Sequence, residues 1–409
     1  MAVVVQKYGG SSVANADRIR NVARRAAATK DKGNQVVVVV SAMGDTTDDL
    51  IELAHQITDR PDEREMDVLL STGELISSTL LTMALKKMGY DAISLSGAQA
   101  GIQTDSDHSR ARIKAIEAQR ITKELEQGRI VVVAGFQGIT QDMDVTTLGR
   151  GGSDTTAVAL AIALKAKICE RYTDVEGVYT ADPTLVPEAR KLKTVNYEEM
   201  LELATYGAKI LHPRAVELGE LFQMPILVAS SFTDAPGTVV TGGSNMEIRN
   251  KARGLAHDTN VAKVTVLGVP DKPGVATAIF EPLAAAGVSV DTIVQNASVG
   301  RVTDLTFTVT RSDLRKAMDV VRPVAKSIGA RDCVSDATLA KVSVVGTGMQ
   351  NTPGYAARMF RALYEAGVNI ELITTSEIRI TCIIAEDKLK TALQALHKAF
   401  QLERENNSQ

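Results

Sequence analysis

The segment Lys7-Tyr-Gly-Gly-Ser-Ser12 has the composition of an anion site. It directly follows a short apolar run, so its glycines stand at a strand end, where backbone N–H groups can approach phosphate oxygens. Lys7 adds a compact positive charge, but it precedes the glycines, unlike the lysine of a GxxxxGK[ST] loop. The motif indicates either a phosphate site or a strand end with a solvated lysine.

A second glycine-rich segment is Thr147-Leu-Gly-Arg-Gly-Gly-Ser-Asp-Thr-Thr156. It precedes an apolar stretch, Ala157 to Ala166, that predicts a helix with free N–H groups facing an anion. Capping of that helix alone would explain Ser153 or Asp154. It would not explain Arg150 beside glycines, because a guanidinium fork suits a carboxylate or phosphate. We therefore favour binding over capping.

Weaker signals lie in three other loops. Ser71-Thr-Gly-Glu74 places a carboxylate at a predicted loop-to-helix junction, where favourable charge at a helix N-terminus is the simpler reason. Ser41 follows a strand and Thr47 stands in the next loop, where α/β sheets bind ligands. Thr173 to Pro183 is turn-rich, and its single aromatic residue either holds a base or belongs to a turn. His212-Pro reads as a helix end, with Lys209 solvated.

The elements that carry these motifs form an α/β pattern. Val36–Val40 and Ile130–Ala134 are continuous β-branched runs, which are typical of parallel strands buried on both faces. Helix-like stretches lie at residues 75–88 and 109–126. Alternation of strand and helix continues to about Val228 and predicts an α/β sandwich.

Beyond residue 240 the sequence changes character. Residues 241–260 are polar and without periodicity, which indicates a linker. A repeat follows, because the same eighty-residue offset separates Pro273 from Pro353 and Gly287 from Gly367. Each copy ends in an alternating strand, Leu305-Phe307-Val309 in one and Ile378-Ile380-Cys382 in the other. This alternation predicts two β-α-β-β-α-β modules, each an antiparallel sheet with helices on one face.

The composition fits a globular protein in a reducing compartment. The chain has 409 residues, 44% hydrophobic and 23% charged, with a net charge of −3, so there is no basic excess for a nucleic acid or a membrane. Its opening apolar run is too short for a signal peptide or membrane span. Three separated cysteines favour the cytoplasm, and five scattered histidines predict no protein-held metal site.

The order of the motifs resembles that of the aspartate kinases. The segments KYGGSS, VVVSAMGDTTD, STGE, AGFQG, LGRGGSDTTA, TDVEGVYTADP and YGAKILHP, followed by a tandem repeat, cover the chain from Val3 to about Phe400. The resemblance implies a fold in two parts: an N-terminal amino-acid-kinase-like three-layer α/β sandwich, then two ferredoxin-like α+β ACT domains. The expected divisions are 1–240 for the catalytic domain, 241–262 for the linker, 263–336 for ACT domain 1 and 337–409 for ACT domain 2. The absence of a dehydrogenase half is similar to the monofunctional type.

The resemblance also implies a reaction and its residues. The family transfers the γ-phosphoryl of ATP to the β-carboxylate of L-aspartate, with Mg²⁺ on the ATP phosphates. The residues expected to be catalytic are Lys7, Gly10 and Asp154. Those expected to bind aspartate are Ser41, Thr47, Glu74, Arg150, Ser153 and Asp154. Those expected to bind ATP are Lys7, Tyr8, Gly9, Gly10, Thr173, Asp174, Tyr179 and Lys209. Related kinases often carry Arg after the ADP tripeptide where this chain has Thr184, and whether Arg190 substitutes is open.

ACT domains bind amino acids, so the resemblance implies effector sites in the repeats. Lysine and threonine are the expected effectors, acting alone or together, because aspartate feeds lysine, threonine and methionine synthesis, with the diaminopimelate branch included. The alternative is that Pro-Gly is only a turn and the polar residues cap helices. The expected effector residues are Asp271, Gly274, Ala276, Ser289, Val290, Asp291, Gln295, Tyr355, Ala356, Asn369, Ile370, Ser376 and Glu377.

Other interpretations stay open on the sequence alone. The chain could be another amino-acid kinase, such as an acetylglutamate or glutamate 5-kinase, or a catalytically silent amino-acid sensor. As to assembly, we expect a homo-oligomer, or a hetero-oligomer with an ACT-only subunit started internally at Met246.

Overall fold

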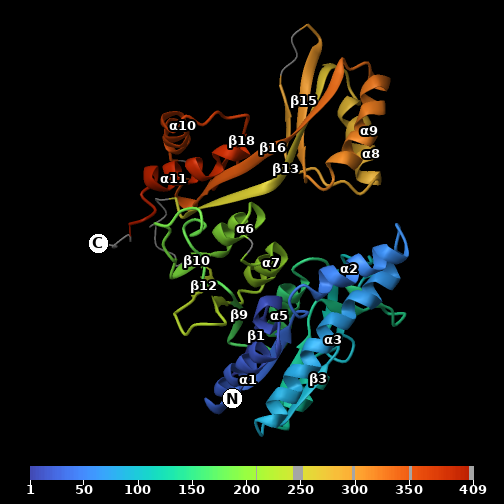
Figure 1. The fold of residues 1–409 in the computed structure, drawn as a ribbon, viewed down its shortest axis with the longest axis vertical. Coiled ribbons are helices and arrows are strands. Elements are labelled where there is room, and N and C mark those ends of the chain that lie inside the picture. The colour runs from blue at the N-terminus through green and yellow to red at the C-terminus, as the bar shows by residue number, and fades with distance from the viewer. Residues whose placement is uncertain (209, 243–251, 297–299, 350–351, 405–409) are drawn as a thin grey trace. The chain divides into compact units, whose positions relative to one another are not determined.

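The computed structural model describes residues 1–409 except 209, 243–251, 297–299, 350–351 and 405–409. The chain divides into two compact units. Unit 1 comprises Met1–Tyr179 and Lys191–Met246, and unit 2 comprises Thr180–Arg190 and Glu247–Gln409. Both units are mixed α/β (Figure 1), as the sequence predicts.

Unit 1 is built on a sheet of eight strands in the order β10-β12-β11-β9-β1-β2-β6-β3. Its strands are β1 (Val3–Tyr8), β2 (Gln35–Val40), β3 (Ala92–Leu95), β6 (Ile130–Ala134), β9 (Ile168–Thr173), β10 (Thr194–Asn196), β11 (Ile226–Ser230) and β12 (Thr238–Thr241). The two valine-rich runs pair in parallel, Val37 opposite Val131, as expected from their continuous β-branched character. Only the pairing of β11 with β12 is antiparallel among the described strands of this sheet.

A second, smaller sheet in unit 1 has the order β5-β4-β7-β8. Its strands are β4 (Ile102–Thr104), β5 (Ile113–Ile116), β7 (Gln137–Ile139) and β8 (Val145–Thr147). The sequence predicts a helix over 109–126, but only α4 (Gln119–Glu126) is helical there. Ala111, Ile113 and Ala115 alternate with charged residues, which is the period of a strand.

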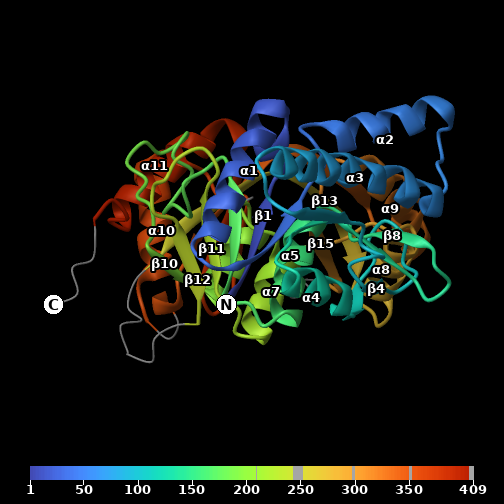
Figure 2. The same cartoon turned by 90° about the horizontal axis from the view of Figure 1, so that it is seen from below.

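Helices cover both faces of the large sheet, which makes the three-layer sandwich (Figure 2). The helices of unit 1 are α1 (Ala16–Asp31), α2 (Thr46–Ile57), α3 (Glu63–Lys87), α4 (Gln119–Glu126), α5 (Gly152–Ala163), α6 (Tyr197–Thr205) and α7 (Pro213–Leu221), with the 3-10 turn η1 (Gly10–Val13). Val36, Val38 and Val40 share one core with Ile19 of α1 and Leu81 of α3. α5 and α7 pack on the opposite face.

Helix α3 is longer than the predicted 75–88. Asp62 caps it by accepting hydrogen bonds from the Arg64 and Glu65 N–H groups. Ser71-Thr-Gly-Glu74 therefore lies inside the helix and not at a loop junction, which corrects the expectation. Residue 73 has to be a glycine for the helix to lie this close to Ala42, because a Cβ at this position would stand 2.8 Å from the Ala42 Cβ.

By length and composition, α3 could also cross a bilayer, and among the described residues it is the one helix that passes this test. Half of its apolar stretch is buried inside the structure, as in the core helix of a globular unit. Asp67 and Glu74, at 0% and 3% exposure, lie within that buried part. We therefore assign α3 to the core of unit 1.

Unit 2 contains one six-stranded sheet in the order β14-β15-β13-β16-β18-β17, shared by both repeats. Its strands are β13 (Gly254–Pro270), β14 (Ile293–Gln295), β15 (Val302–Val309), β16 (Asp332–Val345), β17 (Leu372–Thr375) and β18 (Arg379–Ala385). Its helices are α8 (Val275–Ala285), α9 (Leu314–Ile328), α10 (Tyr355–Glu365) and α11 (Leu389–Ala399), with the short turns η2 (Thr347–Met349) and η3 (Glu386–Lys388). One core gathers under α8 and α9 and a second under α10 and α11.

Two expectations about unit 2 are corrected. Residues 254–262, assigned to the linker, form the first half of β13, because they pair with β16 residues 339–345. Residues 243–251 of the expected linker lie outside the described residues. In β18, Arg379 and Thr381 are as buried as Ile380 and Cys382, so neither face of that strand is solvated. Alternation predicted the inward face of β15 correctly, since Leu305, Phe307 and Val309 are buried.

The segment Thr180–Arg190 belongs to unit 2, although its flanking residues belong to unit 1. Ala181 and Val186 lie in the core under α10 and α11, at 3% and 1% exposure. The Thr180 hydroxyl lies 3.0 Å from His397 Nε2, and the Gln394 amide donates to the Leu185 carbonyl at 3.1 Å. This segment is thus an integral part of the second repeat's core.

Candidate active site

The centre of the candidate site is an ion pair between Lys7 and Asp154. Lys7 is near the end of β1, and Asp154 is in the first turn of α5. The Lys7 Nζ lies 2.7 Å from the Asp154 Oδ1, and the two side chains are 6% and 5% exposed. Lys7 is therefore not a solvated lysine at a strand end.

Arg171 of β9 is a third member of this cluster, and the sequence analysis did not select it. Its Nε lies 3.4 Å from the same Asp154 oxygen. Its Nη1 is buried and has no hydrogen-bond partner among the described residues. A guanidinium with an unpaired buried donor is suited to an anion. The signal available in the sequence was a charge inside a strand next to the strand that carries Lys7.

Burial and neighbouring charges act in opposite directions on the pKa values of this cluster. Burial lowers the pKa of Lys7, and the nearby Arg171 adds to this, while the charge of Asp154 opposes it. Burial favours the protonated form of Asp154, but the charges of Arg171 and Lys7 and their hydrogen bonds outweigh it, and its pKa is about 2. Asp154 also accepts a hydrogen bond of 3.3 Å from the His212 N–H.

Neither predicted cap acts as one. The N-cap of α5 is Gly151, and no side chain caps it, because Ser153 and Asp154 are already inside the first turn. Ser153 is 5% exposed and faces Gly135, where a Cβ would stand 2.9 Å from the serine Oγ. The expectation for His212 is also corrected. His212 does not end a preceding helix; it is the N-cap of α7, with Pro213 at the first helical position.

Glu74 carries a buried carboxylate with one unused oxygen. It is 3% exposed. Its Oε1 accepts a hydrogen bond of 3.0 Å from the Ala42 N–H, while Oε2 is buried without a partner among the described residues. Burial raises its pKa to about 7. A cation delivered by a ligand would satisfy Oε2 and restore the charge.

Arg150 stands between two glycines whose backbone conformation only glycine adopts easily. Gly149 and Gly151, on either side, have φ values of +78° and +72°. The Arg150 side chain is 90% exposed, and its Nη2 lies 3.5 Å from the Asp48 Oδ1 of α2. Its guanidinium is thus open to a ligand. Thr47, half-buried, stands in the first turn of the same helix α2.

The glycine loop is more closely packed than expected. The Gly9 N–H donates to the Tyr172 carbonyl at 3.3 Å, so it is not free for a phosphate, which corrects the expectation for this group. Tyr8 is 0% exposed and its ring stacks on Tyr172, so the ring is not available to a nucleotide. Gly10 fits closely, since a Cβ there would stand 3.0 Å from the Ala42 carbonyl oxygen. Ser41 continues this loop, and its carbonyl accepts from the Ser77 hydroxyl at 2.7 Å.

The expected nucleotide residues follow β9. Thr173 ends the strand, and its hydroxyl donates to the exposed Asp174 carboxylate at 2.9 Å. Tyr179 forms an isolated bridge with Lys191. Thr184 is exposed and hydrogen-bonded to Asp182. Lys209 lies outside the described residues.

The expected effector residues recur at matching places in the two repeats of unit 2. Gly274 and Gly354, with φ of +91° and +100°, are the N-caps of α8 and α10. Lys341 pairs with Asp291, and Lys263 pairs with Glu371 at 2.8 Å, beside Asn369. Two predicted residues, Val290 and Ile370, are half-buried after these helices. The remaining predicted residues form two groups: Ala276, Tyr355 and Ala356 in the helices, and Asp271, Ser289, Gln295, Ser376 and Glu377 in or beside the strands and loops.

Among the described residues, no group of three or more histidine, cysteine, aspartate or glutamate side chains is arranged to hold a metal ion.

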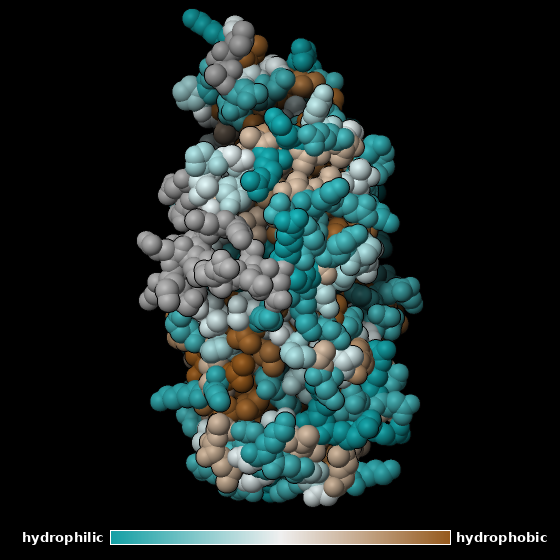
Figure 3. Space-filling model, turned by 90° about the vertical axis from the view of Figure 1, so that its left-hand side faces the viewer, coloured by the Kyte–Doolittle hydropathy of each residue, from teal (hydrophilic) through white to brown (hydrophobic). Residues whose placement is uncertain are grey.

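One face of the molecule is largely hydrophilic, with its hydrophobic residues in small groups (Figure 3).

The fold and site define an amino acid kinase with ACT domains. The model of the amino acid kinase family matches residues 2–230, and an ACT domain model matches residues 264–323 and 342–400. The aspartokinase of Mycolicibacterium smegmatis is 52% identical over 408 residues, covering 98% of this chain and 97% of that protein. The chain belongs to the aspartokinase family and is a phosphotransferase whose acceptor is a carboxyl group.

Solved structures agree on the fold. Escherichia coli aspartokinase III in complex with aspartate and ADP (R-state) has a TM-score of 0.80 at 24% identity, covering 98% of this chain and 100% of that one. The same enzyme in complex with lysine and aspartate (T-state) has a TM-score of 0.76 at 25% identity, covering 97% and 99%.

Proposed function

We propose that this chain transfers the γ-phosphoryl group of ATP to the β-carboxylate of L-aspartate and forms 4-phospho-L-aspartate. The observation that carries the proposal is the buried cluster of Lys7, Asp154 and Arg171 at the end of β1, beside the glycine loop. Two cations held by one carboxylate leave a net positive charge where the loop can receive a phosphate.

The reaction needs little acid–base chemistry from the protein. The attacking carboxylate of aspartate is already ionised at neutral pH, so the chain has to align two polyanions and stabilise the charge on the transferred phosphoryl. In the proposed mechanism Lys7 neutralises that charge and Gly10 permits close approach of the backbone. Asp154 fixes the Lys7 side chain, at 2.7 Å, and its charge opposes the lowering of the Lys7 pKa by burial.

Aspartate is held through its α-amino and α-carboxylate groups in this proposal. The unpaired Oε2 of Glu74 receives the ammonium, and the exposed guanidinium of Arg150 grips the α-carboxylate. Ser41, Thr47 and Ser153 complete the pocket. The E. coli enzyme solved with aspartate supports aspartate as the acceptor.

On the nucleotide side, Thr173, Asp174 and Tyr179 form the proposed ATP loop, with Lys209 as a second cation. Mg²⁺ would come as part of the ATP substrate and would offset the negative charge of its phosphates. Arg171 adds a donor that the sequence analysis did not anticipate, since its Nη1 is unpaired among the described residues.

The ACT repeats are proposed to bind lysine, threonine or both as feedback inhibitors. The E. coli enzyme was solved with lysine in a T-state, which supports lysine for the family. Helix N-termini at Gly274 and Gly354 suit the carboxylate of an amino acid. The reaction is then the first step toward lysine, threonine and methionine in the cytoplasm, in a homo-oligomer or with an ACT-only subunit.

A trapping assay tests the proposal. Hydroxylamine converts an acyl phosphate into a hydroxamate, so the purified chain with ATP, Mg²⁺ and aspartate should release ADP and form aspartyl hydroxamate in equal amounts. Parallel reactions with glutamate and N-acetylglutamate should give none. Hydroxamate from those acceptors instead would indicate another amino-acid kinase. No product with aspartate, but binding of lysine or threonine, would indicate a silent sensor.

A further inference from the structure

A buried carboxylate outside the site just described ties together the segments that precede Arg150. Asp67 is on α3, seven residues before Glu74 and therefore two turns away on the same helix face. It is 0% exposed. A buried aspartate without a cationic partner on its own helix face is rare and has to be fully hydrogen-bonded.

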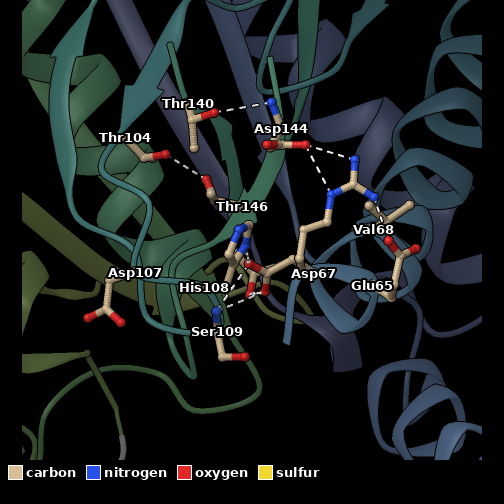
Figure 4. Close-up of polar contacts among 12 residues, drawn as sticks. Glu65, Asp67, Val68, Thr104, Asp107, His108, Ser109, Thr140, Asp144 and Thr146 are labelled. Carbon is tan, nitrogen blue, oxygen red and sulfur yellow. Dashed lines mark hydrogen bonds and ion pairs between the residues drawn. The ribbon is translucent and has the colours of Figure 1, made fainter. Parts of the chain in front are cut away.

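The partners of the Asp67 carboxylate among the described residues lie on other elements, and Figure 4 shows two of them, His108 and Ser109. His108 Nδ1 lies 2.8 Å from its Oδ2, and the Ser109 N–H donates to both oxygens at 3.0 and 3.1 Å. The hydroxyl of Thr147 donates to Oδ1. Asp67 thus joins α3 to the loop 105–111 and to the last residue of β8.

These two joined segments are also fastened to each other. The Ala111 N–H donates to the Thr147 carbonyl at 2.9 Å. Arg214 of α7 donates to the Leu148 carbonyl at 2.7 Å and to the Ala111 carbonyl at 3.0 Å. Thr147 and Leu148 are therefore held from two sides directly before Gly149 and Arg150.

The backbone is in the left-handed conformation at both Ser109 and Gly149. Ser109 has a φ of +68°, which a serine adopts only when its surroundings impose it, and the Asp67 carboxylate holds its N–H. A Cβ at Gly149 would stand 3.1 Å from the Ser109 carbonyl oxygen, so the loop lies close against Gly149. Loss of the Asp67 bonds would release Ser109 toward the left-handed glycine that precedes Arg150.

Arg150 has little of its own to fix its position. Its side chain is 90% exposed, and its one ion pair within the described part of the chain, at 3.5 Å to Asp48, is on the surface. Its placement therefore depends on the backbone that delivers it. We propose that Asp67 is a positioning residue for aspartate binding, which acts by fixing the Thr147–Gly149 backbone that carries Arg150. This inference rests on the proposed function, in which Arg150 binds the α-carboxylate.

The isosteric variant Asp67→Asn tests it. It removes the charge and replaces one accepting oxygen with an NH₂ donor. That donor would face groups that themselves donate, the Ser109 N–H and the Thr147 hydroxyl. The aspartate KM should rise between about tenfold and a hundredfold, as a small displacement of a substrate-positioning group does, while the ATP KM stays within about twofold. A purely structural role would raise neither KM selectively in the folded fraction. Thermal melting and circular dichroism establish that fraction.

The control is the Arg64–Asp144 pair, which also joins α3 to the β7–β8 hairpin. The Arg64 Nη2 lies 2.7 Å from Asp144 Oδ1, but on the surface, at 47% and 36% exposure. Asp144→Asn should leave both KM values within about twofold, because a surface pair contributes little. If Asp67→Asn fails to fold, Thr147→Val removes one bond from the same carboxylate and should raise the aspartate KM in the same direction by less.

A double-variant cycle makes the test specific. If Asp67 acts through Arg150, then Asp67→Asn combined with Arg150→Lys should raise the aspartate KM by much less than the product of the two single effects. Multiplicative effects, equal rises in both KM values, or an unchanged aspartate KM in folded Asp67→Asn would each overturn the inference. Failure of the wild-type protein to phosphorylate aspartate would instead overturn the proposed function.

Discussion

Lys7 and Arg171 are register partners on the adjacent parallel strands β1 and β9, and both direct a cation to the same oxygen of Asp154. Their distances to Oδ1 are 2.7 and 3.4 Å. Asp154 therefore keeps a counter-charge when either cation is removed. This makes it feasible to test Lys7 by substitution, since the loss of a lone partner would leave an unpaired buried carboxylate.

The first prediction is that Lys7→Ala lowers kcat by about 10²–10⁴, because one phosphate-neutralising cation is removed from the transition state. The melting temperature should fall only modestly, since Arg171 still pairs with Asp154. Steady-state kinetics and thermal melting measure the two effects. Lys167→Ala, at an exposed lysine before β9, is the control and should keep wild-type kcat. A kcat for Lys7→Ala within tenfold of wild type would refute the role of Lys7.

The second prediction concerns pH. Burial raises the pKa of Glu74 to about 7. Below that pH the carboxyl is protonated and cannot pair with the ammonium of aspartate, so the aspartate KM should rise by about tenfold per pH unit as pH falls below 7. The ATP KM should lack this dependence. KM values measured from pH 5.5 to 8.5 test the prediction.

Glu74→Gln is the control for that pH profile. The variant should have a high aspartate KM without the rise below pH 7. In the ligand-free wild type, the folded chain holds a proton that the unfolded chain releases above 4.5, so Glu74 favours folding at low pH, and this contribution is lost as pH rises through about 7. Glu74→Gln should therefore raise the melting temperature at pH 8 more than at pH 5. A wild-type aspartate KM that is flat with pH would exclude the assigned role.

The third prediction is that Arg150→Lys raises the aspartate KM far more than the ATP KM. Lysine keeps the charge but loses the planar fork that grips a carboxylate with two hydrogen bonds. Initial-rate kinetics with each substrate varied in turn provide the measurement. Arg110→Lys, at a nearby exposed arginine, should change neither value. Equal rises for both substrates would place Arg150 on the phosphates.

The fourth prediction is that inhibition can be weakened without loss of catalysis. Glu377 and Gln295 are exposed residues of unit 2, and loss of one polar partner of the bound effector should raise the inhibitory concentration of lysine or threonine by about tenfold. Glu377→Ala and Gln295→Ala should keep the uninhibited kcat and aspartate KM.

Inhibition curves with lysine, threonine and their mixture measure this effect. Glu365→Ala, at an exposed glutamate at the end of α10, is the matched control and should have a wild-type curve. Unchanged curves in both test variants would mean that the effectors bind elsewhere. Lost activity without effector would mean that these residues support the fold.

The fold was predictable from the sequence where patterns were long and regular. The valine runs gave the parallel pair β2–β6, and the repeat spacing gave two related halves of unit 2. The helix predicted over 109–126 is present only as α4, because residues 113–116 alternate with the period of a strand and form β5. The shared six-stranded sheet was not predictable, since pairing of the β13 start with β16 depends on contacts far apart in sequence.

Motifs in the sequence selected Lys7, Glu74 and Arg150, and the structure shows the first two buried and the third exposed, while their roles stay predictions. Arg171 and Asp67 gave no such signal, because single charges in a strand or a helix are common on surfaces. Burial makes the interactions of these two charges stronger, and it follows from the packing of elements that are distant in the sequence. For Gly9 the motif indicated a free N–H donor. In the structure this N–H donates to the carbonyl of Tyr172 in β9.

The second unit is assembled from two stretches of sequence, so a product that starts after the first stretch contains only part of it. Ala181 and Val186 are core residues of the second repeat, yet they precede the expected start at Met246, which itself lies outside the described residues. A polypeptide begun at Met246 would lack both side chains, so the core of the second repeat would be smaller in it than in the full-length chain.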